Sequence, residues 1–200
     1  MESKKGQITI FVIIAVVIIG GVITYFLVRD KLSVSNVPQS IDPLYQDFLK
    51  CLEDDSSTGI NLLESRGGYI ETPRFEPGSE YMPFSSQLDF LGTPVPYWYY
   101  VSGNNIQKEQ VPSINEMQQQ LEDYINKQIV ECDLTQRYNE GFEVEFGKPT
   151  TTVKISDNKV NVNLNLQIGV KKGEDSAVIK SHQIEINSKL GNFYNYAKKI

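Results

Sequence analysis

Residues 150–170 read "TTTVKISDNKVNVNLNLQIGV", and this stretch decides the class of fold. Two runs alternate between apolar and polar side chains and meet at Asp157-Asn158, a pair typical of a tight turn. In the second run the apolar positions are Val160, Val162, Leu164, Leu166 and Ile168, and the polar ones are Asn161, Asn163, Asn165 and Gln167. A strict period of two predicts a hairpin with one face in a core and the other in water.

Similar patterns flank this hairpin on both sides. Residues 141–148, "GFEVEFGK", alternate in the same way, with Phe142, Val144 and Phe146 on the apolar face. Residues 171–176, "KKGEDS", are typical of a turn, and residues 177–188 read as a further strand. We therefore expect three or four antiparallel strands.

Residues 41–68 predict the first helix. Asp42 is a candidate N-cap, Pro43 suits the first helical position, and Gly67-Gly68 supplies a left-handed stop. Apolar residues recur at steps of three and four, at Leu44, Phe48, Cys51, Leu52, Leu62 and Leu63. The polar stretch "DDSSTG" (54–59) leaves open whether this is one helix or two.

Residues 112–132 predict a second helix. Ser113 and Glu116 form a capping box after Pro112. One face carries Ile114, Met117, Leu121, Ile125 and Ile129. Two helices packed on a three- to four-stranded antiparallel sheet make an α+β domain.

The segment between the helices, residues 69–112, is rich in proline and aromatic residues. Short strands are predicted in "GGYIETPRF" (67–75) and in "PVPYWYYVSGNN" (94–105). Tyr97, Trp98, Tyr99 and Tyr100 cannot all point inward on one strand. They are a candidate recognition surface for a surface protein or a glycan, or they pack beneath the proline-rich loop.

The chain has two cysteines, Cys51 and Cys132, and they do not form a C-x-x-C pair. That spacing argues against a zinc site or a redox motif. In an exported domain two distant cysteines favour a structural bridge, here from the first helix to the end of the second. Two free buried thiols are the alternative.

The sequence contains no recognisable catalytic pattern. His182 is its single histidine and lies in phase with Ile184 and Ile186, so a core or sheet-edge position is expected. Glu143 and Glu145 are typical of a wet strand face, and "EDD" (53–55) is typical of a solvated helix face rather than a calcium loop. We expect no enzymatic activity, no catalytic residue, no metal and no cofactor.

A long uncharged run lies near the N-terminus, from Ile8 to Val28, followed by Arg29-Asp30-Lys31. Twenty-one helical residues cover the roughly 30 Å hydrocarbon core of a bilayer. We expect a retained single-pass helix in contact with membrane lipid. Lys4 and Lys5 precede it, which favours an N-terminus inside the cell and the C-terminal domain outside.

The membrane helix divides the chain into three predicted parts: a leader and transmembrane helix (1–31), a linker (32–40) and an extracytoplasmic α+β domain (41–200). Acidic residues outnumber basic ones by about eight after the membrane helix, which argues against nucleic acid as a partner. The last residues, "LGNFYNYAKKI" (190–200), begin another helix, so we expect the native chain to continue beyond Ile200.

The sequence "KKGQ" (4–7) before the apolar run resembles the class III (type IV pilin-like) signal of archaeal pilins and archaellins. The resemblance implies that a prepilin peptidase cuts between Gly6 and Gln7 and leaves the membrane helix on the mature protein. The fifth mature position is Phe11, where many pilins have a glutamate. The whole chain resembles an uncharacterised family of archaeal membrane-anchored proteins.

Two functional hypotheses follow. The first is a cell-surface protein with a membrane anchor and a disulfide-stapled domain that binds or scaffolds a partner. The alternative is a pilin-like structural subunit of a surface filament.

Overall fold

The computed structural model describes residues 18–20, 37–78, 80 and 85–199. The chain divides into two units, Met1–Asn36 and Val37–Ile200. Apart from the helical residues 18–20, the predicted membrane helix lies outside the described residues, as does the predicted cleavage site at Gly6 and Gln7. Of the helices in the described part of the chain, none is both long enough and apolar enough to cross a membrane.

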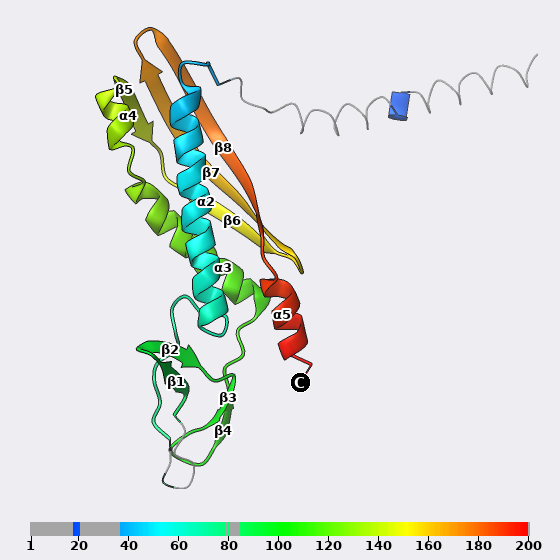
Figure 1. The fold of residues 1–200 in the computed structure, drawn as a ribbon. Coiled ribbons are helices and arrows are strands. Elements are labelled where there is room, and N and C mark those ends of the chain that lie inside the picture. The colour runs from blue at the N-terminus through cyan, green and yellow to red at the C-terminus, as the bar shows by residue number, and fades with distance from the viewer. Residues whose placement is uncertain (1–17, 21–36, 79, 81–84, 200) are drawn as a thin grey trace, which may run out of the picture. The chain divides into compact units, whose positions relative to one another are not determined.

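The second unit is built on a four-stranded antiparallel sheet (Figure 1). Its strands are β5 (Phe142–Phe146), β6 (Thr150–Ile155), β7 (Lys159–Lys172) and β8 (Asp175–Asn187). Strand β7 is central: β8 pairs along one edge, while β6 and β5 pair with successive parts of the other edge. The predicted antiparallel sheet is confirmed.

The hairpin of β6 and β7 follows the sequence pattern closely. Ile155 pairs with Val160 across the turn at Asp157-Asn158. The five predicted apolar positions of β7 are all buried, and the polar positions between them lie on the other face. Strand β5 follows the pattern less well: Phe142 is buried, whereas Phe146 is 37% exposed and contacts Phe48 with ring centroids 6.2 Å apart.

Helix α2 (Asp42–Ser65) is continuous for 24 residues, about 36 Å at 1.5 Å per residue. The stretch 54–59 does not interrupt it. Gly59 faces the next helix so closely that an added Cβ would lie 2.5 Å from Leu121 Cδ1. The prediction of Asp42 as N-cap is wrong: Ile41 holds that position, because the amides of Ile41 and Asp42 both bond the carbonyl of Pro38 in a turn before the helix.

Helix α3 (Ile114–Gln128) continues into a 3-10 turn, η1 (Ile129–Glu131). Its capping box is confirmed: Ser113 Oγ accepts from the Glu116 amide at 3.1 Å, and Glu116 Oε2 accepts from the Ser113 amide at 2.7 Å. Two short helices complete the unit, α4 (Thr135–Asn139) and α5 (Leu190–Ala197).

Helix α3 also covers the outer edge of β6 with side-chain acceptors. Gln118 Oε1 accepts from the Ile155 amide at 3.0 Å, and Glu122 Oε1 accepts from the Val153 amide at 2.8 Å. One turn further along the helix, Asn126 Oδ1 accepts from the Thr151 hydroxyl at 2.8 Å. The helix thus satisfies strand amides that a further β-strand would otherwise bind.

The proline-rich segment forms two small hairpins at the C-terminal end of α2. The first pairs β1 (Gln87–Phe90) with β2 (Thr93–Pro96), and the second pairs β3 (Tyr99–Val101) with β4 (Gln107–Glu109). The strand predicted in 67–75 is wrong. There the amides of Ile70 and Glu71 bond Gln120 Oε1 of α3, instead of the backbone of a neighbouring strand.

One hydrophobic core joins α2, α3 and the inner face of the large sheet. The predicted disulfide is present: Cys51 is bonded to Cys132, with their Cα atoms 6.1 Å apart, and links α2 to the residue after η1. His182 is fully buried in this core. Its Nε2 lies 2.8 Å from the carbonyl oxygen of Leu166, and its ring packs edge-on against Phe48.

Candidate binding site

An apolar pocket of about 320 Å³ opens where α2 ends. Its walls come from four parts of the chain: the C-terminal end of α2 with the turn after it, Trp98 between the two hairpins, the start of α3 and the last helix, α5. The apolar side chains around it are Leu63, Trp98, Met117, Leu190, Phe193, Tyr194 and Ala197. A volume near the lower end of the roughly 300–1,000 Å³ range of ligand sites suits one or two large side chains.

Trp98 is fixed in the pocket wall by both ends of its ring system. Its indole N–H donates to the carbonyl oxygen of Gly67 at 2.8 Å, and its ring packs edge-on against Tyr194 at 5.8 Å between centroids. Gly67 has φ +64°, and a Cβ there would lie 3.3 Å from the carbonyl oxygen of Pro96. Glycine therefore both ends the helix and lets the first hairpin approach it.

Helix α5 is held against the turn between β6 and β7. A Cβ at Gly191 would lie only 2.5 Å from the carbonyl oxygen of Ser156, so the backbones approach as closely as glycine allows. Asn195 Nδ2 donates to Asp157 Oδ1 at 3.0 Å. This contact places Tyr194 in the wall while Phe193, at 63% exposed, stays at the surface.

The pocket has one carboxylate in its lining, Glu64, which accepts a hydrogen bond from the Ser188 hydroxyl at 2.8 Å. The pocket lining pairs no nucleophile with a general base. Among the described residues, no three histidine, cysteine or acidic side chains lie close enough together to hold a metal ion. The chemistry of the pocket is that of apolar contact.

The four aromatic residues predicted as a recognition surface have different environments. Trp98 lines the pocket, whereas Tyr99 is 57% exposed. Tyr97 is half-buried, with its backbone bonded to Ser86 and Gln110. Tyr100 lies beside Glu76; partial burial, and then the charge of Glu76, raise the pKa of its hydroxyl.

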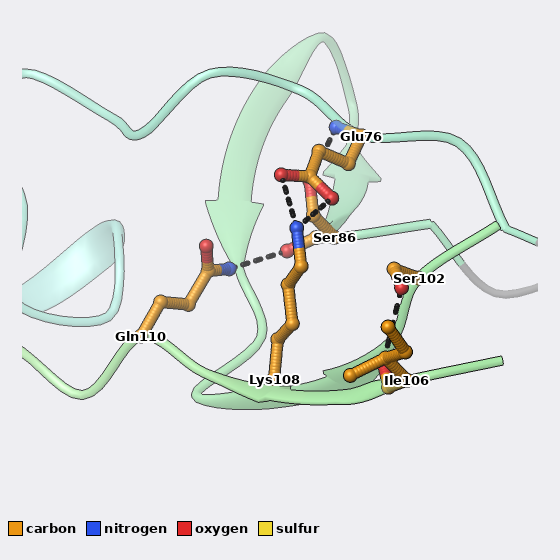
Figure 2. Close-up of polar contacts among 6 residues, drawn as sticks. All are labelled: Glu76, Ser86, Ser102, Ile106, Lys108 and Gln110. Carbon is orange, nitrogen blue, oxygen red and sulfur yellow. Dashed lines mark hydrogen bonds and ion pairs between the residues drawn. The ribbon is translucent and has the colours of Figure 1, made fainter. Parts of the chain in front are cut away.

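A polar cluster ties the two hairpins together (Figure 2). Lys108 Nζ donates to both carboxylate oxygens of Glu76, at 2.7 and 2.8 Å, and this contact lowers the pKa of Glu76 and raises that of Lys108. Gln110 Nε2 donates to the carbonyls of Ser86 and Tyr97, both at 2.7 Å. Each of these hydrogen bonds joins two groups of the same chain, so we assign the cluster a structural role.

The tip of the first hairpin is apolar and exposed. The two-residue turn Leu91-Gly92 has φ +53° and +84°, and Asp89 Oδ1 accepts from the Gly92 amide at 2.8 Å. Leu91 is 92% exposed and Phe90 is 61% exposed. Sequence reasoning missed both this tip and the pocket. A glycine after "DFL" within an alternating run was the available signal for the hairpin.

Comparisons of the chain with protein-family models, with curated proteins and with solved structures give no match. The site is therefore interpreted from its own residues.

Proposed function

We propose that the chain is a single-pass, membrane-anchored cell-surface protein whose disulfide-stapled domain binds an apolar segment of a partner. The pocket beside Trp98 is the binding site, and the protein acts by recognition rather than catalysis. The anchor is the apolar run from Ile8 to Val28, with the N-terminus inside the cell. That part of the proposal is supported by the sequence pattern alone.

The pocket is the observation that carries the binding function. It lies at the C-terminal end of α2, whereas the chain enters the domain at the other end of this helix, about 36 Å away. At the entry end, the Ser40 hydroxyl donates to Asp175 at the start of β8. Within the described domain, the chain therefore begins near the end of α2 that is opposite to the pocket.

The pocket walls are well supported, which favours binding without large rearrangement. The Cys51–Cys132 bridge links α2, which carries Leu63, to the residue that follows α3 and η1, and α3 carries Met117. Three independent contacts fix the remaining walls: the Trp98–Gly67 hydrogen bond, the Gly191–Ser156 approach and the Asn195–Asp157 hydrogen bond.

Trp98 makes this proposal directly testable, because it is the single tryptophan of the chain. The purified protein is titrated with the capped dipeptide of phenylalanine and leucine while tryptophan emission is recorded. We expect a saturable change in emission that the capped dipeptide of serine and asparagine does not produce. The Ala197→Phe variant places a large side chain at the pocket rim and should weaken binding at least tenfold.

Failure of the apolar dipeptide to change the emission, or equal binding by Ala197→Phe, would remove the support for the pocket as a binding site. The location is tested separately by adding protease to intact cells. Digestion within residues 41–200 is expected, and complete protection until lysis would contradict the proposed orientation.

A further inference from the structure

The tip of the first hairpin has a composition that folding of the chain does not explain. A two-residue turn with positive φ at both positions is normally built from asparagine or aspartate followed by glycine. Here Leu91 occupies the first position at φ +53°, and it is almost fully exposed. A leucine in the left-handed region is strained, and an exposed leucine does not offset that strain by packing within its own chain. A contact with another molecule therefore explains the choice of leucine better.

We propose that Phe90 and Leu91 of one copy insert into the Trp98 pocket of a second copy, and that the second copy returns the same contact. This inference rests on the proposed binding function of the pocket and names its occupant. The resulting dimer is a two-fold pair in which the same surface of each chain meets itself.

The hairpin tip and the Trp98 pocket match in size and in apolar character. The tip presents two adjacent large apolar side chains, and the pocket offers about 320 Å³ with mainly apolar walls. Phe193 at the pocket edge is itself 63% exposed and would be covered by the incoming tip. Burial of both exposed surfaces removes apolar area from water, which is the main favourable term in protein association.

The charges at the rims of the two surfaces are also complementary, and the carboxylate in the pocket lining, Glu64, already accepts from the Ser188 hydroxyl. Asp89 precedes the tip, and its Oδ1 accepts from the Gly92 amide within the turn. On the other surface, Lys198 and Lys199 directly follow α5 and are exposed. A docked tip brings an acidic residue towards two basic ones, which steers association and makes it sensitive to salt.

The position of the hairpin favours exchange between copies. Pro96 at the base of the hairpin lies against Gly67, beside the pocket of its own chain. Leu91 at the tip is five residues before Pro96 in the sequence, roughly 16 Å away at the rise of a β-strand, and it is exposed. Each chain therefore carries a tip and a pocket at the same end of the domain, so two copies that face each other can each supply a tip to the other's pocket.

Photocrosslinking tests the contact in the full chain. Benzoylphenylalanine replaces Leu91, and the detergent-solubilised protein is irradiated and digested. We expect a crosslinked dimer whose crosslinks map to residues 63–68 or 190–199. Crosslinks that map elsewhere, crosslinks to a different protein, or the absence of a crosslinked dimer would each overturn the proposal.

Point variants provide an independent measurement by sedimentation velocity. Leu91→Asn retains a residue suited to the left-handed turn and should weaken dimerisation at least tenfold without unfolding the protein. Asp89→Asn keeps the acceptor for Gly92 and should weaken it several-fold, with a smaller salt dependence. Val130→Asn removes an exposed apolar side chain at a distant site and should leave dimerisation unchanged.

Unchanged dimerisation of Leu91→Asn would contradict the reciprocal contact. The dipeptide titration separates this failure from failure of the binding function. If Trp98 still responds to the apolar dipeptide, the pocket binds and a different occupant must be sought. If it does not respond, both proposals fail together.

Discussion

The indole nitrogen of Trp98 lies 2.8 Å from the carbonyl oxygen of Gly67, and this hydrogen bond joins the hairpin module to the end of α2. Gly67 ends the helix in a left-handed conformation, so its carbonyl is free of the helical ladder. This single hydrogen bond thus fixes the turn after α2, holds the start of the second hairpin and positions Trp98 in the pocket wall.

Replacement of Trp98 by phenylalanine tests the value of this hydrogen bond. Trp98→Phe keeps an aromatic ring against Tyr194 but leaves the Gly67 carbonyl without its donor. We expect a loss of about 1–2 kcal/mol in the free energy of unfolding, measured by urea denaturation with circular dichroism. Tyr99→Phe, at the neighbouring exposed position, is the control and should change stability by less than about 0.5 kcal/mol. Equal effects of the two changes would contradict this role of the indole N–H.

The disulfide gives the second prediction. In the chain-entropy model, a bridge that closes a loop of about 82 residues contributes about 4.5 kcal/mol to the free energy of unfolding. We expect the double variant Cys51→Ser with Cys132→Ser to lose several kcal/mol relative to the oxidised protein. Thiol labelling of the unreduced, denatured protein should modify neither cysteine. Two labelled thiols per chain would show that the bridge does not form in the cell.

His182 makes the stability of the core dependent on pH. Burial lowers its pKa below the ordinary value, although the contact with the Leu166 carbonyl partly offsets this effect. The unfolded chain then binds a proton more readily than the folded one. His182 therefore contributes full stability above about pH 6.5, and that stability is lost as the pH falls from there towards the lower folded-state pKa.

Urea denaturation of the protein and of His182→Phe across pH 5 to 8 isolates this effect. The difference in unfolding free energy between the two proteins should change below about pH 6.5 by up to about 1.4 kcal/mol per pH unit. Above that pH the difference should be constant. A difference that is constant over the whole range would show that His182 does not titrate on unfolding.

The main sheet could be predicted because its signal is local. Successive residues of β7 alternate across the sheet, so the pattern from Val160 to Ile168 is visible in the sequence itself. The disulfide followed from two cysteines on predicted helices. In both cases the residues that form the structural feature are the same residues that show the pattern in the sequence.

The open and the wrong predictions concern positions where distant residues decide the local structure. The sequence left open whether residues 54–59 divide the first helix; Gly59 packs against Leu121 of α3, and α2 is continuous. Ile70 has the sequence surroundings of a strand, yet its amide bonds Gln120, fifty residues later. The pocket was missed for the same reason, since Leu63, Trp98 and Leu190 are brought together only by the tertiary fold.

The resemblance at the N-terminus leads to a prediction about processing. If prepilin peptidase recognises "KKGQ" (4–7), intact-mass measurement of the membrane fraction should show a mature chain that begins at Gln7. Gly6→Val should leave the leader in place, since the cut is expected after this glycine. Retention of Met1 in a host with active peptidase would contradict the class III signal. Recovery of the chain in sheared extracellular filaments would favour the pilin-like subunit over the membrane anchor.

The last prediction concerns the edge of β6, which α3 protects. Glu122 Oε1 accepts from the Val153 amide at 2.8 Å, in the middle of the three side-chain contacts along this edge. Glu122→Ala should cost about 1–2 kcal/mol, because it leaves a partly buried amide without an acceptor. It should also raise the tendency to aggregate, because an unpaired strand edge is a template for another chain. Light scattering at moderate urea would show this increase, and Asp123→Ala, on the exposed side of the same helix, should show neither effect. If the two variants behave alike, the acceptors of α3 do not protect the edge.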